Sequence, residues 1–347
     1  MKTLRVGIIG SGGIAQMAHI PNYQKCPDVE VVACCDIVES TAKAAAEKFN
    51  IPQVYTDYRK MLEEVPLDIV SVCTPNYMHK DPTIAALQAG CHVMVEKPIG
   101  MNAQEGRAMV DAAKKAGRKL AVGLNMRQSP AAQALKRAID GGEMGEIYYA
   151  KALALRRRGI PSWGVFGEKD KQGGGPLIDI GVHIMDLTLW LMGHPKPVAV
   201  SGQCYTKFGN RHGVIGVWGQ WNVETFTVED FAVGLVRFEN GATMTVESSF
   251  AANIERDVFD CKILGTEGGC QLDPLRIFTE RHQTLYDTTP VMLPNVNTHE
   301  QNIRKFVEAV REDKEVPVPG EHGLMVTEII DAIYESSEQG REVTLAG

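Results

Sequence analysis

Short apolar segments alternate with amphipathic ones over roughly the first third of the chain. The apolar segments predict β-strands over residues 4–9, 29–35, 68–73, 92–95 and 119–122. Between them, apolar positions recur at the spacing of a helical face, which predicts helices over residues 15–26, 40–49, 58–63, 79–89 and 103–116. Strands that are apolar on both faces and alternate with helices predict a parallel sheet covered by helices on both sides.

The pattern changes after about residue 124. Helices are predicted over residues 131–138, 177–192, 298–312 and 322–338, with an extended run over 146–157. Strand-like segments follow one another directly over residues 198–205, 231–238, 242–250, 259–264, 276–280 and 283–286. Such a succession, with hairpin turns such as residues 239–241, predicts an antiparallel or mixed sheet. The fold class is therefore α/β, with one domain over residues 1–123 and a second over 124–347.

Length and composition agree with a globular protein of about two domains. The chain has 347 residues, 44% of them apolar and 23% charged, and a net charge of −7, which is ordinary for a folded chain of this length. The acidic balance gives no support to nucleic-acid binding, which usually needs a basic face. No run of 18 apolar residues is present to span a membrane. The apolar stretch near the N-terminus is broken by the glycines of residues 10–13, so we expect no signal peptide.

The eight cysteines do not form a metal or redox motif. None is part of a C-x-x-C pair, so a zinc ribbon or a thioredoxin-type site has no support, and we expect no bound metal. Several lie inside apolar segments, such as Cys34 and Cys35, where free cysteine behaves as a small apolar residue. This usage is typical of a reducing compartment and predicts a cytoplasmic protein.

A glycine-rich turn follows the first predicted strand and opens the first predicted helix. Its residues are Gly10, Ser11, Gly12, Gly13, Ile14 and Ala15, a G-x-G-x-x-A pattern. The first glycine permits a tight turn, the second lets the backbone approach a pyrophosphate, and the alanine lets helix and strand pack closely. Phosphates then lie at the helix N-terminus, where free N–H groups favour negative charge. In this context the pattern predicts a dinucleotide site.

Asp36 ends the second predicted strand, 26 residues after Gly10. A carboxylate in this position accepts hydrogen bonds from both ribose hydroxyls of a dinucleotide. It also repels a 2′-phosphate, by about 4 kcal/mol at 4 Å and an effective dielectric near 20. No arginine follows, since the next residues are Ile37 and Val38. The sequence therefore predicts NAD rather than NADP.

Two further groups of polar residues follow predicted strands, where a parallel sheet faces its ligand crevice. The first is Thr74, Pro75 and Asn76 with His79, which by themselves fit an ordinary turn and first helical turn. The second is Glu96, Lys97 and Pro98. A lysine at a buried strand end is unusual. From position alone, Lys97 either reaches solvent or points into the crevice, and the two interpretations are equally good.

A polar pair interrupts the apolar helix predicted over residues 177–192. Asp179 and His183 are four residues apart and share one helical face, and Asp186 lies a further turn along. The pair is either a hydrogen-bonded core histidine held by its aspartate or a general base, since histidine titrates near neutral pH and a carboxylate fixes its tautomer.

In this order along the chain, the elements resemble the Gfo/Idh/MocA oxidoreductase family. The resemblance extends over nearly the whole length and is carried by residues 10–15, Asp36, 74–76 with His79, 96–98, 123–127, Asp179 with His183, and 336–341. One departure is Leu124, where relatives often have an aromatic residue. The resemblance implies a Rossmann nucleotide-binding domain, then an α/β domain with a large open, mostly antiparallel sheet through which relatives commonly form dimers or tetramers. It also implies a nicotinamide cofactor and a sugar or polyol substrate.

The resemblance assigns roles to individual residues. It places Lys97 beside the nicotinamide and the reacting carbon, makes His183 the acid/base, and makes Asp179 its partner or a substrate ligand. Asn76, His79, Glu96, Asn125 and Arg127 are expected to line the cofactor or substrate crevice. In the implied oxidation, His183 takes the hydroxyl proton and Lys97 stabilises the developing oxyanion, an interaction strongest in the transition state.

Three functions remain open on the sequence. The first is an NAD-dependent dehydrogenase of a sugar, sugar derivative or cyclic polyol. The second is an NAD-dependent glycosidase of the same family that oxidises a sugar transiently. The third, a non-catalytic NAD sensor, is disfavoured because Lys97, Asp179 and His183 are all present.

Substrate choice is the least determined feature. Arg156 and Arg158 are predicted to share a strand face and to bind a phosphate or carboxylate, or else to be solvated at a sheet edge. Trp163 is a candidate for stacking on a sugar ring. The segment around Trp218 and Trp221 is a candidate lid or subunit contact.

Overall fold

The computed structural model describes residues 2–345 and divides into two compact units. The first unit contains the chain up to Gln128 together with Val296–Met325. The second contains Ser129–Asn295 and the chain from Val326 on. Each unit is built around one sheet. Within the described residues, no helix is long and apolar enough to cross a membrane.

The first unit is built on a six-stranded sheet in which every pairing is parallel, with strand order β3-β2-β1-β4-β5-β6. The strands are β1 Leu4–Ile9, β2 Val29–Cys35, β3 Gln53–Tyr55, β4 Ile69–Val72, β5 His92–Val95 and β6 Leu120–Val122. This is the strand order of the dinucleotide-binding Rossmann fold, in which the direction of winding reverses between β1 and β4. A ligand crevice is expected at the carboxyl ends of these two strands.

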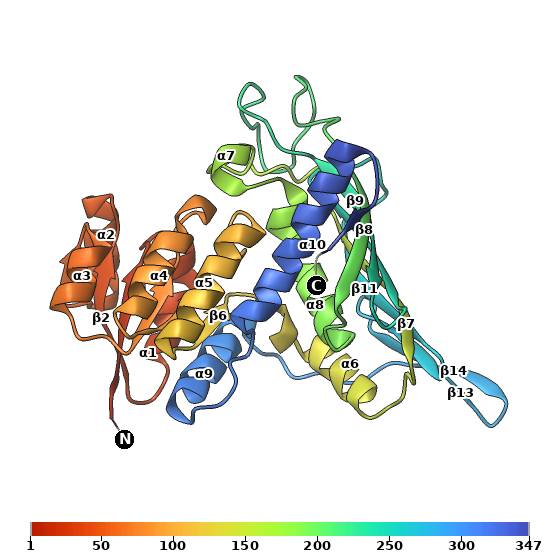
Figure 1. The fold of residues 1–347 in the computed structure, drawn as a ribbon, viewed down its shortest axis with the longest axis horizontal. Helices are drawn as coiled ribbons and strands as arrows, with labels where there is room; N and C mark the ends of the chain where they lie inside the picture. Colours follow the sequence, from red (N-terminus) through yellow and green to blue (C-terminus); the bar gives the residue numbers. More distant parts are fainter. Residues whose placement is uncertain (1, 346–347) are drawn as a thin grey trace. The chain divides into compact units, whose positions relative to one another are not determined.

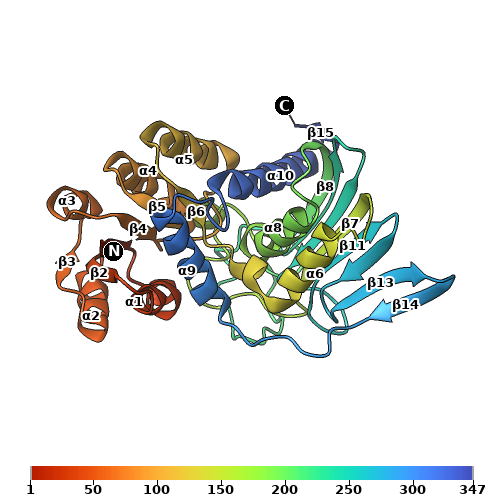
Figure 2. The same ribbon diagram turned by 90° about the horizontal axis from the view of Figure 1, so that it is seen from below.

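Helices cover both faces of this sheet (Figures 1 and 2). They are α1 Ile20–Gln24, α2 Glu39–Phe49, α3 Tyr58–Glu64, α4 Lys80–Gln88, α5 Ala103–Ala116 and α9 Thr298–Arg311. The helix predicted over 15–26 is in fact two pieces, a π-helical turn over Ala15–His19 and then α1. Pro21 lies in the first turn of α1 and has no N–H to donate, and the side chain of Asn22 donates to the Ala18 carbonyl at 2.7 Å. A wider turn before the proline accommodates this change.

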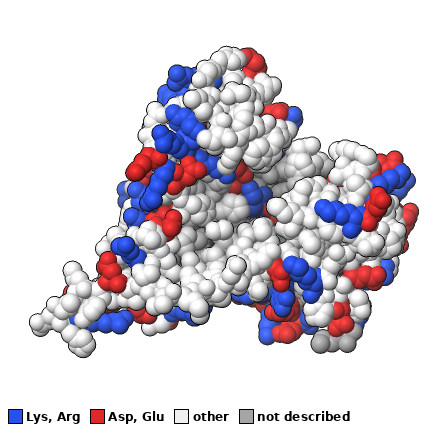
Figure 3. Space-filling view, turned by 180° about the vertical axis from the view of Figure 1, so that it is seen from behind, with Lys and Arg blue, Asp and Glu red and all other residues white. Residues whose placement is uncertain are grey.

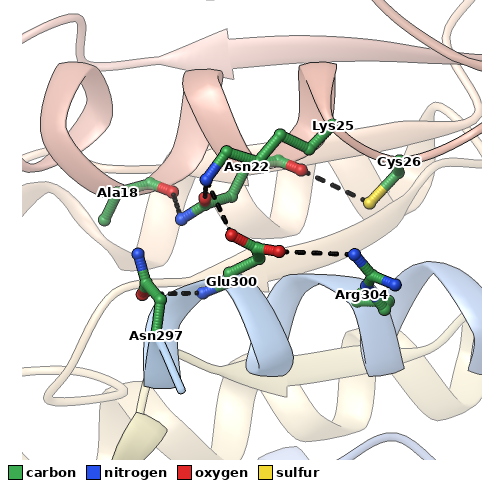
Figure 4. A network of polar contacts seen from close by, with 7 residues as sticks. All are labelled: Ala18, Asn22, Lys25, Cys26, Asn297, Glu300 and Arg304. Carbon is green, nitrogen blue, oxygen red and sulfur yellow. Dashed lines mark hydrogen bonds and ion pairs between the residues drawn. The ribbon is translucent and has the colours of Figure 1, made fainter. Parts of the chain in front are cut away.

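Helix α9 comes from the far end of the chain but packs against α1 (Figure 4). Asn297 caps it by accepting the Glu300 N–H at 3.1 Å, and the Glu300 carboxylate contacts Lys25 of the chain after α1 at 2.7 Å and Arg304 at 3.3 Å. Its apolar residues Ile303, Phe306 and Val307 belong to the core that also contains β1 and β2. The domain limits 1–123 and 124–347 therefore differ from the compact units, because this helix buries its apolar face in the first unit.

The second unit is built on a nine-stranded sheet with order β14-β13-β12-β11-β7-β10-β9-β8-β15. Among the described residues of this sheet, only β7 and β10 pair in parallel. The strands are β7 Ile147–Leu155, β8 Pro197–Tyr205, β9 Phe231–Phe238, β10 Thr243–Ser249, β11 Val258–Gly265, β12 Gly268–Gln271, β13 Arg276–Arg281, β14 Thr284–Thr288 and β15 Val343–Thr344. The α/β fold class and the large, mostly antiparallel second sheet are confirmed.

The helices of this unit are α6 Pro130–Asp140, α7 Lys169–Gln172, α8 Val182–Leu191 and the C-terminal part of α10 Gly320–Gln339. The helix predicted over 177–192 begins as a π-helical turn, Leu177–Gly181, and continues as α8. Helix α8 packs on β7 and β11 and is buried along nearly its whole length. Strands β3, β12 and β15 were not predicted, because β3 and β15 are very short and β12 begins with two glycines.

Candidate active site

The glycine-rich turn follows β1, as predicted. Gly10 has φ +85°, and a Cβ there would lie 2.7 Å from the carbonyl carbon of Cys73, so both the backbone conformation and the close approach require glycine. The Gly10 N–H donates to the Cys35 carbonyl at 2.8 Å, which ties the turn to the end of β2. In contrast, a Cβ on Gly12 or Gly13 would meet nothing within 4 Å. The open side of the turn is where a bound phosphate would need room.

Asp36 lies beside this turn at the end of β2. One carboxylate oxygen accepts the Ser11 N–H and the other accepts the Val38 N–H, both at 2.9 Å. These two bonds fix the orientation of the side chain and connect it directly to the glycine turn. Since each carboxylate oxygen has a second acceptor position, Asp36 retains the capacity to bind two hydroxyl groups.

A cavity of about 470 Å³ opens at the carboxyl ends of β1, β2 and β4. It is lined by Ile9, Gly10, Gly12, Gly13, Cys35, Asp36, Ile37, Val38, Thr56, Tyr58, Cys73, Thr74, Pro75, Tyr77, Met78 and Pro82. Among these described residues, Asp36 is the only charged one. The cavity thus combines apolar walls, an open glycine turn and one carboxylate, which fits the adenosine end of a dinucleotide. Seven of the predicted cofactor residues line it: Gly10, Gly12, Gly13, Asp36, Ile37, Thr74 and Pro75.

His79 is buried rather than placed on the wall of this cavity. Its Nδ1 lies 2.7 Å from the Pro98 carbonyl and its Nε2 lies 2.9 Å from the Thr74 carbonyl. Burial lowers the pKa of His79 although both carbonyls oppose this change. A neutral ring has one N–H and donates to only one of these two carbonyls at a time. His79 lies between the loop after β4 and the turn after β5 and contacts both.

A buried ion pair lies behind the candidate lysine, and the sequence analysis missed it. His19 Nε2 is 2.8 Å from Glu96 Oε1, with only 2% of the histidine exposed. The other ring nitrogen contacts Ser71 Oγ at 3.1 Å, and the Tyr23 hydroxyl contacts the same Ser71 oxygen at 2.9 Å. Glu96 was predicted to line the crevice, whereas the structure turns its carboxylate toward His19. Residues 19 and 96 lie far apart in sequence, but the period of the first helix could have indicated a polar residue on its buried face.

The charges of this pair stabilise one another. Burial alone would lower the pKa of His19, but its contacts with Cys73 and Glu96 outweigh burial and raise the pKa to about 10. Burial alone would raise the pKa of Glu96, but His19 outweighs it and lowers the pKa to about 2. Because burial also raises the pKa of the Cys73 thiol, Cys73 is protonated at neutral pH, and Glu96 is the charge that holds the imidazolium.

Lys97 follows directly after this pair, in the turn that ends β5. The peptide bond between Lys97 and Pro98 is cis, and the Lys97 N–H donates to Glu96 Oε2 at 3.3 Å. The lysine is half-buried. Of the remaining candidates in this turn region, Ser11 is buried, and Ile14 and Asn76 are half-buried.

Asn125 and Arg127 contact the segment that returns from the C-terminal part of the chain. Asn125 Nδ2 donates to Thr298 Oγ1 at 2.7 Å, and Arg127 Nη1 lies 3.2 Å from His322 Nδ1. Both residues are buried. Burial, with Arg127 beside it, lowers the pKa of His322 to about 4, so the imidazole is neutral and accepts from the guanidinium at neutral pH. These two candidates therefore join parts of the first unit, a contact that sequence reasoning did not predict.

In the second unit, Asp179 lies in the π-helical turn and His183 in the first turn of α8. Asp179 Oδ2 lies 4.0 Å from Arg156 Nη1, and both side chains are largely buried. His183 is half-buried, and Asp186 is fully buried. The sequence predicted that Asp179 and His183 share one face of a regular α-helix. Asp179 instead lies in a π-helical turn that precedes α8, and His183 lies about one turn further along the chain.

The arginines after β7 do not form the predicted strand face. The strand ends at Leu155, and Arg156 Nη1 donates to the Gly159 carbonyl at 3.2 Å as well as facing Asp179. Arg158 donates to the Ala252 carbonyl at 2.8 Å. Trp163 is 55% exposed. The prediction of alternating arginines on one strand face was wrong because β7 ends at Leu155, two residues before the end of the predicted extended run.

Comparison with known proteins identifies the family. The model of the oxidoreductase family with an NAD-binding Rossmann fold matches residues 4–124, and the model of its C-terminal α/β domain matches residues 136–345. The chain belongs to the Gfo/Idh/MocA oxidoreductase family. It is therefore an NAD(P)-binding oxidoreductase.

Individual relatives cover nearly the whole chain. D-glucoside 3-dehydrogenase of Escherichia coli K12 is 38% identical over 99% of this chain and 97% of the relative. The NAD(+)-dependent scyllo-inositol 2-dehydrogenase of Bacillus subtilis 168 is 28% identical over 99% of this chain and 96% of its own length. A solved structure of levoglucosan dehydrogenase in complex with NADH and levoglucosan superposes with a TM-score of 0.86 at 25% identity, covering 99% of this chain and all of that chain.

Proposed function

We propose that this oxidoreductase is an NAD-dependent dehydrogenase that oxidises a secondary hydroxyl group of a sugar, a sugar derivative or a cyclic polyol. Relatives named for action on glucosides, scyllo-inositol and levoglucosan support this substrate class. One observation carries the preference for NAD: Asp36 is the only charged residue among the described residues that line the cavity at the end of β1.

The charge of Asp36 separates the two cofactors. A 2′-phosphate about 4 Å from this carboxylate costs about 4 kcal/mol at an effective dielectric near 20, which is about a thousandfold in affinity. A free 2′-hydroxyl instead donates a hydrogen bond to the same carboxylate. The structure holds the side chain in place through Ser11 and Val38, so it has little freedom to turn away from a phosphate.

Three residues are proposed to serve the reaction. His183 accepts the hydroxyl proton, and Asp179 orients it or binds a neighbouring hydroxyl. Lys97 stabilises the negative charge that develops on the substrate oxygen, an interaction that is strongest in the transition state. When bound, the nicotinamide ring would accept the hydride from the carbon that carries the hydroxyl group. Asn76 and Arg127 are kept as proposed contacts of the cofactor or substrate, while the contacts of His79, Glu96 and Asn125 support a role in holding the turns.

The test is nicotinamide absorbance at equal enzyme concentrations with NAD and NADP, against free sugars, glycosides, polyols and sugar phosphates. We expect reduction of NAD by one sugar or polyol class and a kcat/KM with NADP that is about a thousandfold lower. The Asp36→Ser variant should narrow this ratio at least tenfold. Equal use of both cofactors by the wild type would overturn the assignment of NAD. Release of an aglycone without net reduction would replace the dehydrogenase with the redox-neutral glycosidase.

We also propose a homodimer or homotetramer formed through the second sheet. Support comes from apolar residues that remain exposed on and after the hairpin β13–β14, among them Leu285, Val291 and Met292. The outer surface of this hairpin, at the lower left of Figure 3, carries few charges. A subunit contact would bury such exposed apolar side chains. The functional domains are proposed to be residues 1–123 and 124–347, with α9 contributed to the first by the second.

A further inference from the structure

Two tryptophans in the second unit are exposed and lie against each other. Trp163 is 55% exposed and Trp218 is 40% exposed. Their ring centroids are 5.6 Å apart, and Phe166 packs edge-on against Trp163 at 6.3 Å. We refer to these three residues as the aromatic platform. Large aromatic side chains are usually mostly buried in a folded protein. Neighbouring aromatic side chains that remain exposed therefore indicate a binding surface.

The aromatic platform is connected to Asp179 through one side chain. The Arg156 guanidinium lies 4.6 Å from the centre of the Trp218 ring, and its Nη1 lies 4.0 Å from Asp179 Oδ2. The buried ring of Phe250 contacts the same guanidinium at 5.5 Å. Arg156 is therefore held by a carboxylate and two aromatic rings. Its position fixes how far Trp218 lies from Asp179.

The segment that carries Trp218 is a long loop with a fixed base. No helix or strand of the described chain lies between β8 and β9, a connection of residues 206–230. Asp230 Oδ2 accepts the N–H groups of Lys207, Phe208 and Gly209 at 2.7, 2.5 and 2.8 Å, and Trp221 Nε1 donates to the Gly209 carbonyl at 2.6 Å. Trp221, one of the two candidate lid residues, is thus a buried anchor. Loops of this length are usually functional when they are ordered.

The outer part of the loop is apolar and is attached beside Trp163. Ile215 and Val217 are exposed, the Val217 N–H donates to the Arg158 carbonyl at 3.0 Å, and Ser162 Oγ donates to the Trp218 carbonyl. In Figure 3 the loop projects at the top of the view, where uncharged atoms dominate its surface. These two hydrogen bonds therefore join the loop that carries Trp218 to the segment that carries Trp163.

We propose that the aromatic platform is a subsite for the group attached to the oxidised sugar, so that the substrate is a glycoside with a ring-bearing aglycone or a second sugar. This inference rests on the proposed function, with Asp179 at the reacting sugar. Arg156 contacts both Asp179 and Trp218 and so lies between Asp179 and the platform. A sugar ring bound at Asp179 therefore reaches the platform only through a second group attached to it. The flat apolar face of a second ring stacks on tryptophan, and the exposed parts of Trp163 and Trp218 offer surface for such a contact.

The charges around the platform favour a neutral occupant. Arg156 already faces Asp179, and Arg158 is bonded to the Ala252 carbonyl and lies over the Phe208 ring at 4.7 Å. Both guanidinium groups already have partners in the protein. We therefore propose that the substrate stacks on the aromatic platform, in place of the predicted contact between these arginines and a phosphate or carboxylate. The relative named D-glucoside 3-dehydrogenase agrees with a glycoside.

The experiment compares phenyl β-D-glucoside with D-glucose in NAD reduction by the full-length enzyme. The variants are Trp163→Ala, Trp218→Ala and the conservative Trp163→Phe. The control is Tyr205→Ala, because Tyr205 has the same 40% exposed fraction, also contacts one aromatic ring, and lies outside the platform. We expect kcat/KM for the phenyl glucoside to fall about tenfold in both Trp→Ala variants, through KM. The kcat/KM of these variants for D-glucose, and that of Tyr205→Ala for both substrates, should stay within about twofold of the wild type. Trp163→Phe should retain most of the wild-type kcat/KM for the phenyl glucoside.

Each other outcome decides between explanations. Equal losses for both substrates, or none, would overturn the subsite. A changed oligomeric state of the Trp→Ala variants in analytical ultracentrifugation would make the platform a subunit contact instead. If no sugar reduces NAD, the proposed function fails. The subsite is then decided by equilibrium binding: quenching of tryptophan fluorescence by phenyl β-D-glucoside supports it only if quenching is lost in Trp163→Ala and Trp218→Ala. Absence of quenching in the wild type overturns it.

Discussion

Replacing Glu96 with glutamine should destabilise the first unit strongly and in a pH-dependent way. The change keeps the shape of the side chain but removes the charge that lies 2.8 Å from His19 Nε2. Removing one partner of a buried ion pair typically costs about 3–5 kcal/mol, because the other partner is left uncompensated.

The pH dependence follows from the directions of the two pKa changes. The pKa of His19 is raised, so its contribution to stability is fully present below pH 6.5 and is lost as pH rises through about 10. The pKa of Glu96 is lowered, so its contribution is present above pH 4.5 and is lost as pH falls through about 2. The free-energy difference between wild type and Glu96→Gln should therefore be largest between pH 4.5 and 6.5 and should narrow toward both extremes.

The assay is urea denaturation of both proteins at pH 5.5 and pH 9.5, followed by far-UV circular dichroism. The control is Glu39→Gln, which breaks an exposed ion pair with Lys43 and should leave the denaturation midpoint unchanged. The double variant His19→Gln, Glu96→Gln should recover part of the loss, since it leaves no buried charge unpaired. A cost below about 1 kcal/mol at pH 5.5, or the same cost at both pH values, would refute the reasoning.

Three further predictions concern the site and the loop. Lys97→Ala and His183→Ala should each lower kcat by about 10²–10³ with unchanged NAD affinity by fluorescence titration; retained turnover would remove the assigned role. Gly12→Ala should leave the thermal unfolding midpoint unchanged, because a Cβ there meets nothing within 4 Å, but it should weaken NAD binding measurably. Gly10→Ala should instead lower the unfolding midpoint, because a Cβ there meets the backbone of Cys73. Asp230→Ala leaves three N–H groups without their acceptor, which costs about 1–3 kcal/mol. Limited proteolysis should then cleave within residues 206–229 faster than in the wild type.

The parts that were predictable from the sequence are those in which local pattern and chemistry coincide. Apart from the short β3, the strands of the first sheet follow apolar runs. The turn after β1 is marked by its glycines, of which Gly10 has a positive φ that other residues rarely adopt. Asp36 was placed by its position at the end of β2, and the structure shows it bonded to Ser11 of that same turn. The succession of strands in the second half likewise predicted a largely antiparallel sheet, with β7 and β10 as the parallel exception.

The parts that were not predictable depend on contacts between residues far apart in sequence. Nothing near Glu96 indicates that His19 neutralises it, and nothing near Asn125 indicates Thr298. Arg156 was predicted to lie on a strand with alternating side chains. Its guanidinium instead contacts Asp179 and the ring of Trp218, which belongs to a loop without regular structure. The π-helical turns before α1 and α8 were also outside the reach of periodicity, since apolar spacing does not distinguish them from α-helix over five residues.

The return of α9 to the first sheet has a consequence for how the protein is made. A ribosome completes β6 long before it reaches Ile303, Phe306 and Val307, which are part of the core that also contains β1 and β2. During that interval the nascent nucleotide-binding region exposes apolar surface that α9 later covers, while the whole nine-stranded sheet is being synthesised. Assembly of the first unit must therefore wait for the second to emerge, and a chain stopped at Gln128 would be a substrate for chaperones rather than an independent domain.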